Sequence, residues 1–166
     1  MAAGATYTPI ATTTLGANSA TITFSSISSS YTDLRVVLVG LPTTANAVSC
    51  TLQFNSDTAT NYSWTRLTGD GTSAASVSLA SSNYISINSF LQFSSTIPNM
   101  ITADIFSYAG STYKTVLGSA VQNFNGSGNI LNMVGLWRNT TAINRIDINA
   151  TGGSFATSTI ATLYGI

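Results

Sequence analysis

The side chains that most often carry out enzymatic chemistry are scarce in this chain. Its 166 residues include five acidic side chains, five basic ones, no His and no Glu. General acid–base catalysis usually draws on His, Glu, Asp, Lys or Tyr, so two of its five usual reagents are missing. A Ser-His-Asp or Cys-His arrangement within the chain is excluded. The composition therefore predicts a protein that is not an enzyme, with no catalytic residues and no cofactor.

Oxygen ligands gather in one segment, where Asn55, Asp57 and Asn61 lie close together, and Asp70 follows in another. Calcium takes six to eight oxygens and normally several carboxylates. An Asx-rich turn between strands explains the same spacing with fewer requirements, and it is the interpretation we favour. We predict no metal site here.

Cys50 is the single cysteine, so no disulfide can form within the chain. Without His or a second Cys there is no zinc site. Cys50 alternates with Val48, Leu52 and Phe54, a pattern that predicts a small buried core residue.

Two pairs of opposite charges, Asp33 with Arg35 and Arg145 with Asp147, are each two residues apart. On a strand, residues two apart share a face, so each pair is expected to form a surface ion pair. The favoured interpretation is a solvated strand face, and the alternative is a charged spot at a subunit contact.

Aromatic residues on a hydroxyl-rich β protein are also typical of sugar-binding surfaces. We expect core or interface packing to account for most of them here. The residues in phase with or beside the predicted core are Phe24, Phe54, Phe93 and Trp137. Those predicted to be better exposed are Tyr7, Tyr31, Tyr62 and Tyr113.

The elements that must position these residues are strands. Glu is absent, Lys occurs once, and 26 Thr and 24 Ser dominate the composition, which disfavours helices. Apolar residues alternate with polar ones through residues 20–24 and 48–54, whereas residues 34–39 form a denser run that predicts a strand covered on both faces. Residues 72–83, mostly Ser and Ala, are predicted to be a loop or a weak edge, and residues 84–93 a strand.

Turn signals at residues 69–71, 125–129 and 152–153 separate the predicted strands. About eight to ten short strands without helices predict an all-β fold, an antiparallel β-sandwich of jelly-roll type. We expect residues 1–166 to form one domain, with residues 1–14 as an extended N-terminal arm.

The balance of acidic and basic residues indicates which classes of partner the chain is not suited to bind. A net charge of zero supplies no basic footprint for nucleic acid and no attraction to an anionic membrane. The N-terminal residues have no signal-peptide pattern, and no apolar run reaches the length of a bilayer span. Because nearly neutral proteins tend to associate, we expect a homo-oligomer packed within an assembly.

Several segments together resemble a family of small virion proteins of tailed bacteriophages. They lie at residues 10–15 (Ile-Ala-Thr-Thr-Thr-Leu), 22–27 (Ile-Thr-Phe-Ser-Ser-Ile), 31–34, 54–57, 61–63, 134–138 (Val-Gly-Leu-Trp-Arg) and 155–166. The resemblance spans nearly the whole chain and is weakest from residue 71 to residue 96.

The resemblance implies a virion structural protein. A capsid decoration or cement protein is the favoured role: a jelly-roll trimer on the exterior of the head, bound to the major capsid protein. A tail fibre or baseplate module that binds host surface glycans is the alternative. An enzyme acting on polysaccharide is a third hypothesis and the least favoured.

Overall fold

The computed structural model describes residues 6–44, 48–88, 95–123 and 126–166 and contains two antiparallel sheets within those ranges. The strands are β1 (Thr8–Thr14), β2 (Thr21–Phe24), β3 (Leu34–Gly40), β4 (Ser49–Phe54), β5 (Tyr62–Gly69), β6 (Ala74–Ser82), β7 (Ile85–Ser86), β8 (Asn99–Phe106), β9 (Lys114–Asn123), β10 (Gly128–Trp137), β11 (Ile146–Thr151) and β12 (Ile160–Gly165). No helix occurs in the described ranges, so the predicted all-β sandwich is confirmed.

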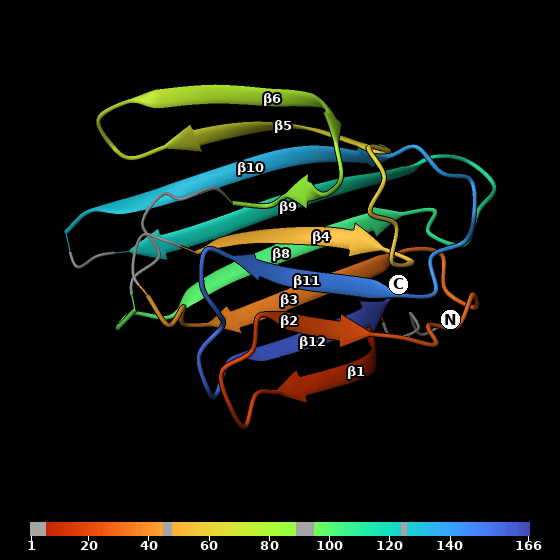
Figure 1. Ribbon diagram of the computed structural model, residues 1–166, viewed down its shortest axis with the longest axis horizontal. Coiled ribbons are helices and arrows are strands. Elements are labelled where there is room, and N and C mark those ends of the chain that lie inside the picture. Colours follow the sequence, from red (N-terminus) through yellow and green to blue (C-terminus); the bar gives the residue numbers. More distant parts are fainter. Residues whose placement is uncertain (1–5, 45–47, 89–94, 124–125) are drawn as a thin grey trace.

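The strand order is that of a jelly roll with additions. One sheet has the order β2-β11-β4-β7, and the other begins β1-β12-β3-β8, so the chain alternates between the two sheets from β1 to β4 and again from β10 to β12 (Figure 1). This winding of eight strands is the jelly-roll arrangement.

Two hairpins widen one of the sheets. The β5–β6 hairpin and the β9–β10 hairpin extend the sheet beyond β8 in the order β9-β10-β5-β6, which gives it eight strands (Figure 1). The predicted turn at residues 69–71 lies at the end of the β5–β6 hairpin, where Gly71 has positive φ. Of the turn predicted at residues 125–129, residue 125 lies outside the described ranges, and Gly126 has positive φ. The eight-stranded sheet is therefore wider than the four-stranded sheet that covers it.

The core lies between the two sheets. Phe24, Phe54 and Trp137 are buried in it as predicted, and so is Cys50, whose burial raises its pKa to about 12. Gly135 allows the second sheet to approach, because a Cβ there would lie 2.7 Å from the buried Ile85 side chain.

The terminal and Ser-rich segments differ from their expected roles. The part of the expected arm from Thr8 to Thr14 is strand β1, paired with β12 of the same chain. The segment predicted to be a loop or a weak edge contains β6, a nine-residue strand at the edge of the eight-stranded sheet, so the edge alternative is confirmed and the loop alternative is wrong. Of the strand predicted over residues 84–93, Ile85 and Ser86 form β7, and residues 89–93 lie outside the described ranges.

A candidate interaction surface

The side of the eight-stranded sheet that faces away from the core carries large apolar side chains. We call this side the outer face. Its exposed apolar residues are Val39, Leu67, Met100, Phe106, Leu117, Ile130, Val134 and Ile160. An antiparallel sheet with one solvated face normally presents polar side chains there. This departure marks the outer face as a candidate interaction surface.

Five of the outward apolar residues form one row across adjacent strands. In register, they are Ile160, Val39, Met100, Val121 and Ile130 on β12, β3, β8, β9 and β10. Directly opposed residues of an antiparallel sheet project from the same side with their Cβ atoms about 5 Å apart. The five side chains therefore make a continuous apolar strip, in which Ile130 is 55% exposed.

The outer side of the four-stranded sheet has the opposite character. There, Thr21 donates a hydrogen bond to Asn149 (2.9 Å) and Asn149 to Gln53 (3.1 Å) across three neighbouring strands. Arg145 and Asp147 form the predicted ion pair on this sheet at 2.7 Å. None of the exposed large apolar side chains among the described residues comes from β2, β4, β7 or β11. The two outer surfaces therefore differ in chemistry.

The sequence of strand β3 reflects this difference between the two outer surfaces. Its dense apolar run predicts coverage on both faces, and Leu34, Val36 and Leu38 are buried against the core as expected. On the other side, Val39 remains 41% exposed, so the described part of the chain covers only one face of β3. The apolar side chains on the outer side of β3 are buried, as its sequence pattern predicts, only if something outside the described part of the chain covers the outer face.

An aromatic pocket of about 350 Å³ lies at one end of the outer face. Tyr7 and Tyr164 meet edge to face with ring centroids 6.1 Å apart, and Arg35 donates a hydrogen bond to the Tyr7 hydroxyl (2.6 Å). Val37, Met100 and Thr102 complete the lining. The pocket offers ring faces, a hydroxyl and a guanidinium to a ligand.

Arg35 does not pair with Asp33, the partner that the sequence spacing predicts. Its ion pair joins Nε to Asp104 on the neighbouring strand β8 at 3.3 Å. The Asp33 carboxylate instead accepts the backbone N–H of Ser107 at 2.6 Å. Cross-strand register, which spacing along one strand does not reveal, sets the pairing. Arg35 and Asp104 are the charged residues at outward positions of the eight described strands.

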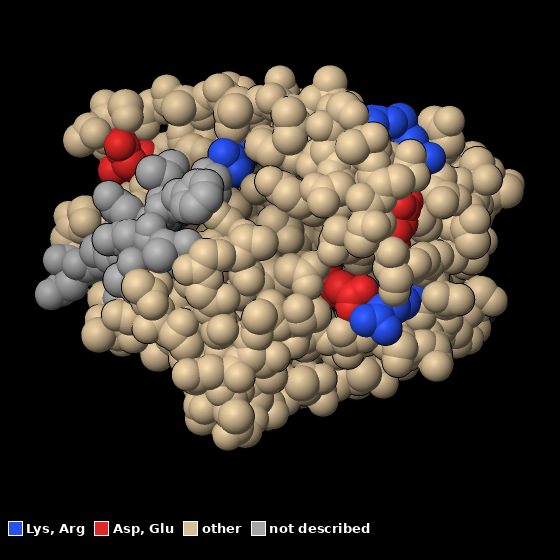
Figure 2. All heavy atoms as spheres, in the orientation of Figure 1, with Lys and Arg blue, Asp and Glu red and all other residues tan. Residues whose placement is uncertain are grey.

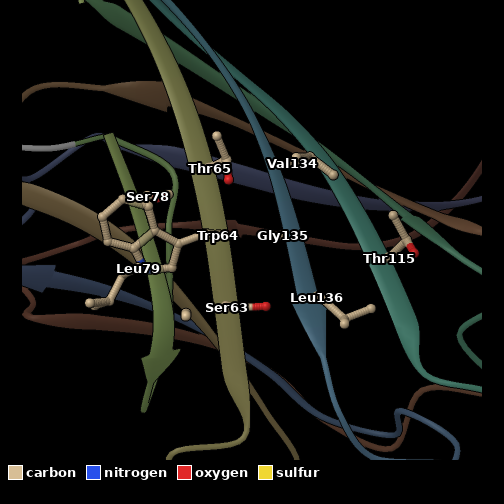
Figure 3. Close-up of a pocket in the computed structure, with 10 residues that line it drawn as sticks. Ser63, Trp64, Thr65, Ser78, Leu79, Thr115, Val134, Gly135 and Leu136 are labelled. Atoms are coloured by element: carbon tan, nitrogen blue, oxygen red, sulfur yellow. The ribbon is translucent and has the colours of Figure 1, made fainter. Parts of the chain in front are cut away.

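A shallow second groove of about 320 Å³ lies where β6, β5, β10 and β9 run side by side (Figure 3). Hydroxyl groups of Ser63, Thr65 and Thr115 line it together with Val134 and Leu136. The lining has no charged side chain. Like the rest of the outer face, the groove is suited to contacts that require little desolvation of charge.

The exposed-tyrosine prediction is right for two of four residues. Tyr113 is 53% exposed and Tyr7 44%, whereas Tyr31 is half-buried. Tyr62 is fully buried and stacks on Trp137 with an interplanar angle of 19°. Its hydroxyl donates to the backbone carbonyl of Asp57 (3.1 Å), which satisfies the polar end of the ring inside the core.

The oxygen-rich loop is an Asx turn, as favoured from the sequence. Asp57 accepts hydrogen bonds from the Ala59 backbone (2.9 Å), the Asn61 amide (3.0 Å) and the Trp137 indole (2.8 Å). Asp70 is bonded in the same way to Thr72 and Ser73 within its own turn. No group of three or more metal-ligating His, Cys, Asp or Glu side chains occurs in the described ranges.

These two carboxylates predict how stability depends on pH. Burial acts to raise the pKa of Asp57, but its hydrogen bonds together outweigh burial and hold the pKa below its usual value. Backbone N–H groups lower the pKa of Asp70 strongly. A carboxyl group whose pKa is lower in the folded state stabilises the fold above its unfolded pKa, about 4, and loses that contribution as the pH falls.

We therefore expect the free energy of unfolding to be flat from about pH 5 to pH 8, because His is the side chain that ordinarily titrates in this range and the chain has none. The free energy of unfolding should fall below about pH 4. Urea unfolding at a series of pH values measures this. The variant Asp57→Asn should have a shallower acid slope. A change of more than about 1 kcal/mol between pH 5 and pH 8 would contradict the expectation.

Comparison with protein-family models, curated proteins and solved structures finds no match for this chain. Within the described residues, no helix is long and apolar enough to cross a membrane.

Proposed function

We propose that the chain is a non-enzymatic structural protein of a tailed-phage virion, a capsid decoration protein that binds the outside of the head lattice through the outer face. The observation that carries the proposal is the apolar row from Ile160 to Ile130 on a sheet face that the described chain leaves uncovered. The resemblance to small virion proteins is the reason for placing the chain in a virion.

The size of the outer face fits such a contact. With strands about 4.8 Å apart and 20–30 Å long, eight of them present on the order of 800 Å². One partner in a stable protein interface contributes about that area. Figure 2 shows the opposite side, that of the four-stranded sheet, where the charged side chains lie in a few small spots. On the outer face itself, the charged residues of the described strands are Arg35 and Asp104, which pair with each other at 3.3 Å. Covering a surface of this kind requires little desolvation of charge.

The mechanism would be mechanical. A protein that binds the assembled lattice but not free capsid subunits shifts the assembly equilibrium toward the lattice by mass action. An oligomer that makes several equivalent contacts strengthens this hold through multivalency. The neutral composition supports association, because little charge repulsion opposes it.

The test is to image particles produced with and without this protein. We expect difference density on the exterior of the head, and heads without the protein should break at lower heat or osmotic stress. Density on the tail, or heads of unchanged strength, would overturn the capsid assignment.

Host-glycan binding is a second candidate, favoured by the aromatic pocket of Tyr7, Tyr164 and Arg35. A sugar ring stacks on exposed aromatic faces, and nearby polar groups fix its orientation. A glycan array probed with the wild-type chain and with Tyr7→Ala tests it. Binding that is lost in the variant supports this candidate, and an array without signal counts against it.

A further inference from the structure

Strand β6 is an edge strand without the usual protection. It lies at the end of the eight-stranded sheet and pairs with β5 on one side only. Eight of its nine residues are exposed. Its sequence, Ala-Ala-Ser-Val-Ser-Leu-Ala-Ser-Ser, contains no Pro, no Gly and no charge. A long uncharged edge is a template for pairing with another strand.

The other three sheet edges are protected in ordinary ways. Strand β1 contains Pro9 and a register shift between Pro9 and Ala11, which interrupt pairing along that edge. Strands β2 and β7 are only four and two residues long. Short strands, prolines and bulges are the devices that keep edges from pairing. Among the described edge strands, β6 alone lacks all of these along Ala74–Leu79, where its register with β5 is regular.

The sequence of β6 fits a second copy of itself. An antiparallel pair centred on Ser78 places Val77 of each copy opposite Leu79 of the other. Small Ala and Ser residues oppose one another on either side of that centre. Val77 and Leu79 are 44% and 41% exposed and project from the same side of the sheet. Pairing would therefore join four apolar side chains across the axis, and opposed apolar pairs stabilise antiparallel strands.

Charge does not oppose this pairing. No residue of β6 is charged, and the acid nearest to it in sequence, Asp70, is bonded to Thr72 and Ser73 at the far end of the hairpin. The Arg138 guanidinium donates to the Ala80 carbonyl and, on the β5 side, to the Tyr62 carbonyl. The guanidinium therefore lies on the β5 side of β6 and does not occupy the free edge of that strand.

We propose that two copies of this chain pair antiparallel through β6 about a two-fold axis at Ser78, so that their eight-stranded sheets become one continuous sheet. Opposed residues of an antiparallel pair project from the same side. Both outer faces would therefore look in the same direction and double the apolar surface. The pairing itself does not depend on the proposed function; only the use of the doubled surface to dock on a lattice rests on it.

Light scattering of the purified chain tests the pairing. We expect twice the 17.2 kDa of one chain, not the threefold mass of the trimer that the phage resemblance implies. Ser78→Lys places two like charges opposite each other on the axis and should shift the mass to that of a monomer. Thr14→Lys makes a similar change on the protected edge strand β1 and should leave the mass doubled. A monomeric or trimeric wild type, or a doubled mass in Ser78→Lys, overturns the proposal.

Cross-linking gives a positive readout that does not depend on destabilising the chain. Directly opposed residues in an antiparallel pair have Cα atoms about 4.5–5.5 Å apart, within disulfide range. The variant Ser78→Cys should therefore form a covalent dimer rapidly on mild oxidation, and Thr14→Cys should not. Cys50 does not interfere, because it is buried with a raised pKa. Equal cross-linking of the two variants would count against β6 pairing. Because both experiments use purified protein, they can fail while the virion assignment stands, and the reverse also holds.

Discussion

Replacing Trp137 with alanine should lower the free energy of unfolding by about 3–5 kcal/mol, the cost of removing a large buried aromatic side chain. Trp137 is 1% exposed and lies between Phe54, at a centroid distance of 5.6 Å, and the stacked ring of Tyr62. Its contact with Phe54 joins β10 to β4 of the other sheet, so truncation removes packing between the two sheets. The melting temperature should fall by about 10 °C for a chain of this length.

The indole N–H adds a polar component that a second variant isolates. It donates to Asp57 at 2.8 Å, so Trp137→Phe keeps most of the ring packing but leaves the partly buried carboxylate without that donor. We expect a loss of about 1–2 kcal/mol for this variant. Tyr113→Ala is the matched control, because Tyr113 is 53% exposed and its truncation should change stability by less than about 0.5 kcal/mol.

Urea unfolding followed by circular dichroism measures both variants without relying on the fluorescence of the altered residue. If Trp137→Ala lost no more than Tyr113→Ala, the aromatic cluster would not be the centre of the core.

The sequence predicted the sandwich because alternation records burial on one side of a strand. In β2 and β4, Ile22, Leu52 and Phe54 face the core as alternation requires. In β6 the alternation is limited to Val77 and Leu79, and the surrounding Ser and Ala residues have weak strand preference. That strand forms beside β5, and the single turn that holds Asp70 brings the two together. Pairing with β5, and not the local strand preference of its residues, therefore determines that β6 is a strand.

The candidate surface was harder to predict than the core. The apolar run of β3 predicted a strand covered on both faces, whereas the described part of the chain covers only its inner face and leaves Val39 41% exposed. A sequence cannot say whether the second covering comes from the same chain. The strip from Ile160 to Ile130 draws on five strands, and only their register brings the residues into one row. Tyr62 shows the same limit, because a tyrosine that hydrogen-bonds to backbone inside a core has no distinguishing pattern in the sequence.

If the outer face docks on the head as proposed, a single lysine in the middle of the apolar row should abolish this docking while leaving the fold intact. Met100 is 44% exposed on β8, near the centre of the eight strands. In the free protein a lysine there stays hydrated, so Met100→Lys should change stability by less than about 0.5 kcal/mol. On docking, its charge would be buried without a partner, at a cost of several kcal/mol. Binding should therefore weaken by about 100-fold or more.

Thr21→Lys is the control for this change, because Thr21 is an exposed residue on β2, in the polar sheet. The measurement is co-sedimentation of each purified variant with heads from a phage that lacks the gene, titrated to saturation. Wild type and Thr21→Lys should bind alike, and Met100→Lys should remain in the supernatant. Since a lysine alters only the face that carries it, the reverse result, in which Thr21→Lys fails to bind and Met100→Lys binds normally, would assign docking to the hydroxyl-rich sheet and leave the apolar row without a role in the virion.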